Sequence, residues 1–110
     1  MKVYLDSCIV IYLIEGNPEN RAAAEAALQA HPPAATVVSD LVRLECRVGP
    51  LRKGDHVLLE RFDNFFASTA VMPLGSAVYD LAAELRAQHR IKTPDAIHAA
   101  AAIFHQRRLK

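Results

Sequence analysis

The sequence predicts an α/β domain built around a mostly parallel sheet. Short β-branched and aromatic segments alternate with longer segments of helical periodicity, an alternation typical of parallel sheets. Hydrophobic residues make up 52% of the chain and charged residues 23%, which excludes disordered, collagen-like and disulfide-rich classes. A chain of 110 residues has room for one core, so we expect residues 1–110 to form a single domain.

The chain begins with a predicted strand and two predicted helices. Residues 1–5 (MKVYL) are β-branched and aromatic, which favours a buried strand. Asp6 or Ser7 can cap the helix that follows, and the Gly-Asn-Pro sequence at 16–18 ends it. Residues 18–31 are rich in Ala and predict a surface helix that ends before two prolines.

A second strand and two further helices follow. Residues 35–38 are apolar and predict the strand, after which Ser39 or Asp40 can cap the helix SDLVRLECRV. The Gly and Pro residues within 49–54 predict a break. Residues 56–66 repeat apolar side chains at a helical period and predict the next helix.

The last part of the chain predicts one strand and two helices. Residues 70–72 read as a strand closed by Pro73, and a helical apolar period begins near Ser76. Thr93 and Pro94 have the residue types that start a final helix, which runs to the end of the chain. Only three strands are predicted, so we expect the sheet to lack a C-terminal strand.

Charge and composition carry no general signal for nucleic acid. Thirteen Lys and Arg residues against twelve Asp and Glu residues give a formal charge of +1. Trp is absent and aromatic residues make up 6%, which leaves few side chains on which single-stranded bases could stack. Any nucleic-acid function must therefore come from a local site.

The cysteines and the apolar run near the start indicate a cytoplasmic protein. Cys8 and Cys46 lie in apolar segments without metal-ligand spacing, so we expect two buried thiols in a reducing compartment. The apolar run 8–14 is too short to cross a bilayer, which takes about 20 residues, and no charged leader precedes it. We therefore expect a cytoplasmic location and no membrane partner.

Two acids stand at positions where a carboxylate can carry chemistry. Asp6 follows the first strand, at the edge where open α/β sheets bind ligands, although a helix N-cap explains it equally well. Glu45 shares a helix face with Leu41 and Val48, which predicts a carboxylate turned toward the core. A buried carboxylate needs a cation or a partner, and a salt bridge to an Arg is the structural alternative.

A third acid completes a candidate cluster. Asp95 lies in the first turn of the last predicted helix, where the helix dipole favours an acid without any function. His98 lies on the same face and either positions a substrate or packs. The α/β layout brings all three acids to one sheet edge, and oxygen ligands suit Mg²⁺ or Mn²⁺, the usual ions of phosphodiester hydrolysis.

Three segments, LDSCIVIYLIEG, SDLVRLE and TPDAIHAAA, resemble the motifs of the PIN domain. The resemblance is closest to the VapC-type ribonuclease toxins of bacterial toxin–antitoxin pairs, and it implies a three-layer α/β/α fold. It also implies metal ligands and catalytic residues at Asp6, Glu45 and Asp95, with supporting residues at Ser7, Ser39 and His98. The family supplies a further Asp in a TND-like segment on a next strand, and this sequence contains no such segment.

The resemblance implies a Mg²⁺- or Mn²⁺-dependent endoribonuclease that is the toxin of a VapBC-type pair. Its implied partners are an RNA substrate, a VapB-type antitoxin that blocks the acidic pocket with a peptide or an Arg, and a second copy in a homodimer. One alternative is a PIN-fold chain that binds RNA or antitoxin without cleaving. Another is a plain α/β domain with three coincidental acids, which predicts no divalent-ion binding.

Basic and aromatic residues add two weaker predictions. Arg90 and Lys92, just before Asp95, are the best candidates for RNA backbone contacts. Arg43 and Arg47 lie on either side of Glu45 in the sequence, and they either face the substrate or pair with acids. The helix with Phe62, Phe65 and Phe66 offers a dimer contact, although ordinary core packing is favoured.

Overall fold

Three short apolar strands form a parallel sheet at the centre of the molecule. The computed structural model describes residues 3–29 and 36–108, with side chains as far as residue 105. The strands are β1 (Val3–Tyr4), β2 (Thr36–Val38) and β3 (Ala70–Val71), and their order in the sheet is β1-β2-β3. The register pairs Val3 with Thr36 and Val37 with Ala70. The prediction of a parallel sheet is confirmed, and the described part of the chain contains no fourth strand.

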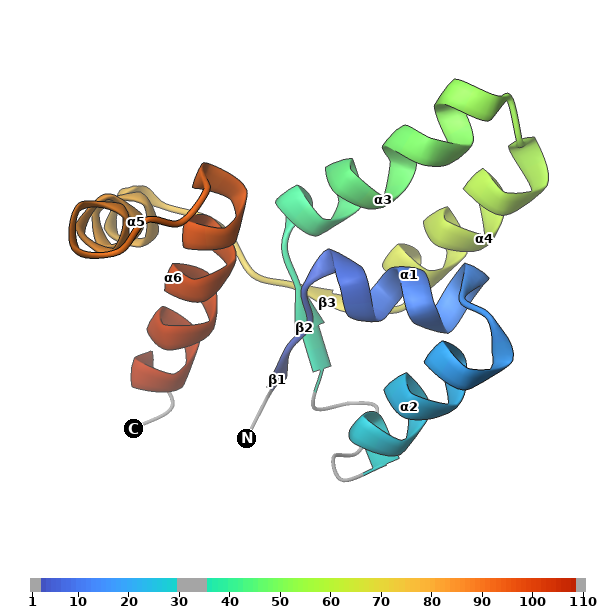
Figure 1. The fold of residues 1–110 in the computed structure, drawn as a ribbon, viewed down its shortest axis with the longest axis horizontal. Coiled ribbons are helices and arrows are strands. Elements are labelled where there is room, and N and C mark those ends of the chain that lie inside the picture. Colours follow the sequence, from blue (N-terminus) through green and yellow to red (C-terminus); the bar gives the residue numbers. More distant parts are fainter. Residues whose placement is uncertain (1–2, 30–35, 109–110) are drawn as a thin grey trace.

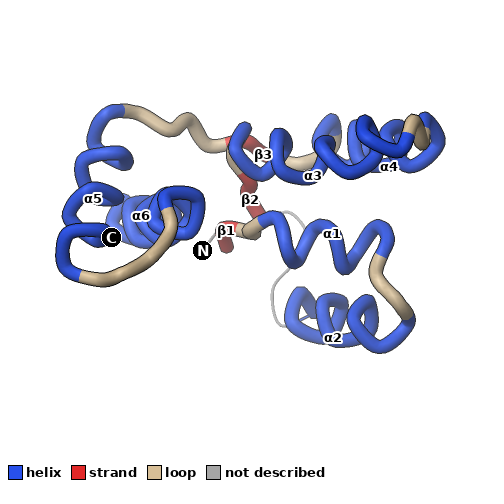
Figure 2. Tube along the Cα trace, turned by 45° about the horizontal axis from the view of Figure 1, so that its top comes forward, coloured by secondary structure: helices blue, strands red, loops and turns tan. Residues whose placement is uncertain are grey.

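Six helices are described: α1 (Ser7–Glu15), α2 (Pro18–Gln29), α3 (Asp40–Lys53), α4 (His56–Ala67), α5 (Ser76–Gln88) and α6 (Thr93–Arg108). Helices α5 and α6 cover one face of the sheet, and α1 to α4 lie on the other side (Figures 1 and 2). The three-layer α/β/α arrangement is therefore confirmed. None of the described helices is long and apolar enough to cross a bilayer.

Alternation along β2 divides the core into two clusters. Successive side chains of a strand point to opposite faces, so Val37 and Val38 are buried on different sides of the sheet. Val38 packs with apolar side chains of α1, α3 and α4, among them Phe62 and Phe66. Val37 packs with small side chains of α5 and α6. Phe62 and Phe66 are therefore core residues, as the favoured interpretation predicted, and Phe65 is partly buried against the same cluster.

Helix α3 differs from its prediction in both length and orientation. The predicted break at residues 49–54 is wrong at its start, because the helix continues through buried Pro50 and ends at Gly54 in a left-handed conformation (φ +66°). Proline weakens a helix by removing one hydrogen bond, but here its ring fills part of the core. The buried side of α3 carries Val42, Cys46 and Pro50, so the stripe of Leu41, Leu44 and Val48 does not face the core as predicted.

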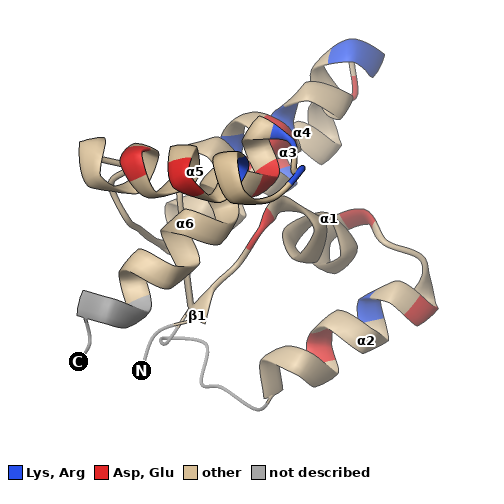
Figure 3. Cartoon of the chain, turned by 60° about the vertical axis from the view of Figure 1, so that its left-hand side comes forward, with Lys and Arg blue, Asp and Glu red and all other residues tan. Residues whose placement is uncertain are grey.

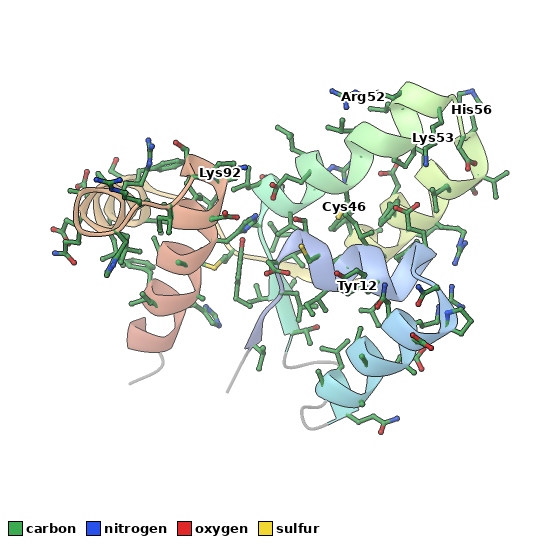
Figure 4. The ribbon with its side chains drawn as sticks, viewed as in Figure 1. Tyr12, Cys46, Arg52, Lys53, His56 and Lys92 are labelled. Atoms are coloured by element: carbon green, nitrogen blue, oxygen red, sulfur yellow. The ribbon has the colours of Figure 1, made fainter. Side chains whose placement is uncertain are left out.

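The two cysteines have different environments. Cys46 is buried between α3 and α1, as predicted (Figure 4). Cys8 is exposed, so the prediction that it is buried is wrong. Cys8 and Tyr12 lie one turn apart on the outward face of α1, whereas Val10 points into the core. Predicted element ends at residues 1–2, 30–31 and 35 lie outside the described residues.

Candidate functional site

The beginnings of three helices meet at the carboxyl edge of the sheet. Helix α1 follows β1 and α3 follows β2, while the first turn of α6 lies beside them (Figure 1). Asp6 stands between β1 and α1, Glu45 in the second turn of α3 and Asp95 in the first turn of α6. The positive ends of helix dipoles favour carboxylates in such places. Figure 3 shows an acidic position where the chain passes from β1 into α1.

Electrostatics around Cys8 indicate that these three acids lie near one another. The pKa of the Cys8 thiol is raised, first by its partial burial and then by the carboxylates of Asp6, Glu45 and Asp95. Each of these carboxylates is therefore within electrostatic range of the thiol. The hydrogen bond between Glu45 and His98, three residues after Asp95 on α6, also brings α3 and α6 together here. The three acids, predicted from distant segments, therefore lie at the same edge of the sheet.

Asp6 and Asp95 differ in how far the fold already uses them. Asp6 caps α1, because its Oδ1 accepts a hydrogen bond from the backbone N–H of Ile9 at 3.2 Å. Its Oδ2 has no hydrogen-bond partner within the described residues. Asp95 is exposed and makes no side-chain hydrogen bond with any residue that the structure describes. Both acids thus present carboxylate oxygens that the protein leaves available.

Glu45 belongs to a chain of hydrogen bonds that joins three elements. Its Oε1 is hydrogen-bonded to Nε2 of His98 on α6. The other ring nitrogen of His98, Nδ1, lies 2.9 Å from the hydroxyl of Tyr4 on β1. The Tyr4 hydroxyl also lies 2.7 Å from Oγ of Ser39. Glu45 is therefore partnered by a histidine and not by the arginine that the structural alternative suggested.

Ser39 occupies the N-cap position of α3 but does not act as a side-chain cap. Its backbone is extended, as in a normal cap, yet its hydroxyl makes no capping hydrogen bond. The residue is fully buried, with 0% exposure, and its Oγ is hydrogen-bonded to Tyr4 instead. Ser39 therefore connects the start of α3 to β1.

Tyr4 is the one residue of this hydrogen-bond series that the sequence analysis did not predict as a site residue. Burial is the largest reason that the pKa of its hydroxyl is raised to about 12, so the group keeps its proton at neutral pH. The signal in the sequence was a tyrosine in a short buried strand, since a buried phenol needs a hydrogen-bond partner. The partner itself lies 94 residues away in the chain, which no local pattern reveals.

The sequence matches the family model of the PIN domain over residues 3–109. The chain belongs to the PIN domain family. Its fold is similar to a toxin–antitoxin complex from Klebsiella pneumoniae, with a TM-score of 0.76 and 25% identity over 96% of this chain and 81% of that chain. It is also similar to VapBC2 from Rickettsia felis, solved with a promoter DNA fragment, with a TM-score of 0.76 and 20% identity over 96% and 83% of the two chains. No curated protein matches the sequence.

The other predicted site residues of this PIN domain have mixed surroundings. Ser7 opens α1, and its carbonyl oxygen lies 3.9 Å from Sγ of Cys46. Arg90 and Lys92 are exposed in the loop before α6, and Figure 4 shows Lys92 at the start of that helix. The loop is held by a hydrogen bond of 3.1 Å from Nε of Arg86 to the carbonyl of Ile91.

The arginines beside Glu45 pair with an acid and do not face the site. Nε of Arg47 lies 2.9 Å from Oδ1 of Asp63 on α4, and Arg43 lies 3.8 Å from the same oxygen. The guanidinium of Arg43 also lies 6.0 Å from the ring centre of Phe66. These contacts join α3 to α4, so of the two possibilities that the sequence left open, pairing with acids is the one observed.

The chemistry of the acidic site fits a hard divalent cation. Its donors are carboxylate oxygens, which Mg²⁺ and Mn²⁺ prefer, and each of the three acids keeps at least one oxygen without a hydrogen bond to the described residues. Within residues 3–29 and 36–105 no three His, Cys, Asp or Glu side chains already stand in a metal-binding arrangement. Asp95 is exposed and makes no side-chain hydrogen bond with a described residue, and Asp6 caps α1 with one carboxylate oxygen, whereas Glu45 is held by His98.

Proposed function

We propose that this PIN domain is a Mg²⁺- or Mn²⁺-dependent endoribonuclease and the toxin of a VapBC-type toxin–antitoxin pair. The observation that carries the proposal is the meeting of three helix starts that bear Asp6, Glu45 and Asp95, with Glu45 hydrogen-bonded to a histidine in the same helix as Asp95. Membership of the PIN family supports a nuclease. The likeness to a toxin–antitoxin complex at 25% identity supports the toxin assignment. We expect it to act on RNA in the cytoplasm.

In the proposed mechanism, Asp6, Glu45 and Asp95 hold the metal ion. A divalent ion bound there would supply positive charge at the scissile phosphate and would lower the pKa of a nearby water. The side chain of Glu45 is kept in place by His98, while Asp6 and Asp95 provide the remaining charge. Together the three carboxylates let the site accept a dication beside a polyanionic substrate.

The RNA backbone is expected to lie along the loop before α6. Arg90 and Lys92 are exposed there, next to the first turn that carries Asp95. Two cations at this place offset the repulsion between the acidic site and the phosphates, and each phosphate contact makes binding more sensitive to salt. The cations at the turn between α3 and α4, Arg52 and Lys53, lie at a distance from this edge (Figure 4).

The experiment that tests the proposal measures Mn²⁺-dependent cleavage of a single-stranded RNA. Asp6→Asn is the informative variant, because asparagine also caps a helix but carries no charge. Asp80→Asn, on the exposed side of α5, is the matched control. We expect cleavage by the wild type and the control and none by Asp6→Asn. Cleavage by all three would indicate a contaminating nuclease, and binding without cleavage by the wild type would favour the alternative of a PIN domain that only binds RNA or antitoxin.

Two protein partners belong to the same proposal. The first is a VapB-type antitoxin that covers the acidic edge, supported by the complexes in which the similar structures were solved. The second is another copy of this chain. The exposed apolar stripe of α3 supports a homodimer through that helix, since side chains as exposed as Leu44 (60%) and Leu51 (56%) favour contact with a partner.

A further inference from the structure

We infer that Tyr4 is a positioning residue, whose hydroxyl fixes the ring of His98 and, through it, the carboxylate of Glu45. The inference deepens the proposed function, because it concerns how a ligand of the proposed metal site is held. It rests on three side-chain hydrogen bonds that run from Ser39 through Tyr4 and His98 to Glu45.

The direction of these hydrogen bonds follows from the groups at the two ends. An ionised carboxylate can only accept, so Nε2 of His98 donates to Glu45. A neutral imidazole that donates from Nε2 must accept at Nδ1, and the hydroxyl at that atom belongs to Tyr4. Tyr4 then accepts the hydrogen of Ser39, 2.7 Å away. Each group thus fixes the donor and acceptor roles of the next.

The position of Ser39 indicates that this arrangement has a purpose beyond packing. A serine at an N-cap normally stabilises its helix through a hydrogen bond between its side chain and the first turn, and Ser39 does not make that hydrogen bond. Its fully buried hydroxyl is directed to Tyr4 instead. The fold thus uses a capping group to orient a phenol that itself orients a histidine.

Glu45 is the side chain that gains from this support. Its side chain is 27% exposed and that of His98 is 11% exposed, so the contact lies at the border between the core and the site. A glutamate has three side-chain torsions and is poorly ordered unless it is held. Hydrogen bonds to a metal-ligating carboxylate fix its orientation, and loss of such a partner typically weakens metal affinity by about 10- to 100-fold.

The test combines Mn²⁺ titration by calorimetry with ¹⁵N NMR of the imidazole rings. The variants are Tyr4→Phe, His98→Gln and the two combined. Tyr79→Phe is the control, because Tyr79 is an exposed tyrosine on α5. The His98→Gln spectrum identifies the His98 signals. Spectra are recorded without metal, at a pH above the titration of the ring.

We expect His98 of the wild type to be protonated at Nε2, and Tyr4→Phe to show a mixture of tautomers and a Mn²⁺ affinity lower by about 10-fold or more. Because Tyr4 acts through His98, the double variant should bind Mn²⁺ no more weakly than His98→Gln alone. Tyr79→Phe should match the wild type in both measurements.

The two ways of failing are distinguishable. An unchanged His98 spectrum in Tyr4→Phe would overturn the inference whether or not metal binds, and so would additive losses of affinity in the double variant. A wild-type protein that shows the expected tautomer but does not bind Mn²⁺ would instead overturn the proposed metal site, while the positioning of His98 by Tyr4 would stand.

Discussion

Asp6 has two carboxylate oxygens, and the fold uses only one of them. Oδ1 caps α1 through the N–H of Ile9, and Oδ2 has no partner within the described residues. The structural and the chemical interpretation of this residue are therefore compatible. Asp6 and Ser39 both occupy N-cap positions, but their side chains are used differently. Asp6 caps α1 and keeps one oxygen available, whereas the hydroxyl of Ser39 is hydrogen-bonded to Tyr4 and does not cap α3.

The double role of Asp6 leads to a prediction about two substitutions. Asp6→Ala should lower the free energy of unfolding by about 1 kcal/mol, because alanine cannot accept the capping hydrogen bond. Asp6→Asn should retain most of that stability. Both variants should lose the Mn²⁺-dependent rise in melting temperature that a bound ion produces. Urea unfolding and thermal melting with Mn²⁺ measure the two effects, and a full Mn²⁺ shift in Asp6→Asn would contradict a metal-binding role.

Single residues also show where sequence analysis succeeds and where it stops. Asp6 and Asp95 lie where strand ends and helix starts predicted them, because local patterns fix both. Glu45 was expected to face the core because it shares a helix face with Leu41 and Val48. The structure places this face at the border of the core, with Leu41 and Glu45 partly buried and Val48 exposed. The partnership of Glu45 with His98 depends on packing between α3 and α6, which no sequence period encodes.

At the scale of elements, α3 is unusual because two of its faces are apolar. Val42 and Cys46 are fully buried, whereas Leu44 and Leu51 are more than half exposed on another side. An apolar period alone cannot tell which face the core will cover, since both faces repeat at a helical spacing. The orientation is decided by the contacts that α3 makes with α1 and α4. The same packing carries α3 through Pro50, where the sequence predicted a break.

The two glycines of this region should respond in opposite ways to the same substitution. Gly54 ends α3 with a φ of +66°, so Gly54→Ala should lower the free energy of unfolding by about 1 kcal/mol. Gly49 lies inside α3 with no atom within 4 Å of an added Cβ, so Gly49→Ala should raise it by about 0.5–1 kcal/mol. Urea unfolding of both variants tests this expectation, and shifts of the same sign would show that α3 does not extend to residue 53.

At the scale of the whole molecule, the sheet is too small to form the core alone. Its strands have two or three residues each, and the two apolar clusters on its faces are built mainly by helices. The α/β class and the element order could be predicted because each short strand is followed by a clear helix start. Which apolar side chains stay exposed on the outer surface could not be predicted, because exposure depends on how the helices pack against one another.

An apolar stripe on α3 remains uncovered within the described residues: Leu44, Val48 and Leu51 are exposed, and Leu41 is partly exposed. Its spacing of three and four residues is that of a coiled-coil seam, which pairs with a copy of itself. Beside the stripe lies an open hollow of about 340 Å³ lined by Asp40, Leu41, Leu44, Leu74 and Tyr79. In a two-fold interface both partners use the same surface, so that surface must be complementary to itself. The protruding stripe and the adjacent hollow allow this, because the stripe of each copy can pack into the hollow of the other.

This surface predicts that the 12.1 kDa chain forms a dimer in solution. The double variant Leu44→Glu/Leu51→Glu places charges on the stripe and should sediment as a monomer, while circular dichroism stays unchanged because both positions are exposed. Ala26→Glu, on the exposed side of α2, is the control and should remain a dimer. A monomeric wild type would contradict the homodimer. If the double variant of such a monomer also failed to bind a VapB-type antitoxin, the stripe would belong to the antitoxin contact, and α3 would then carry both an acid of the proposed metal site and the surface recognised by its inhibitor.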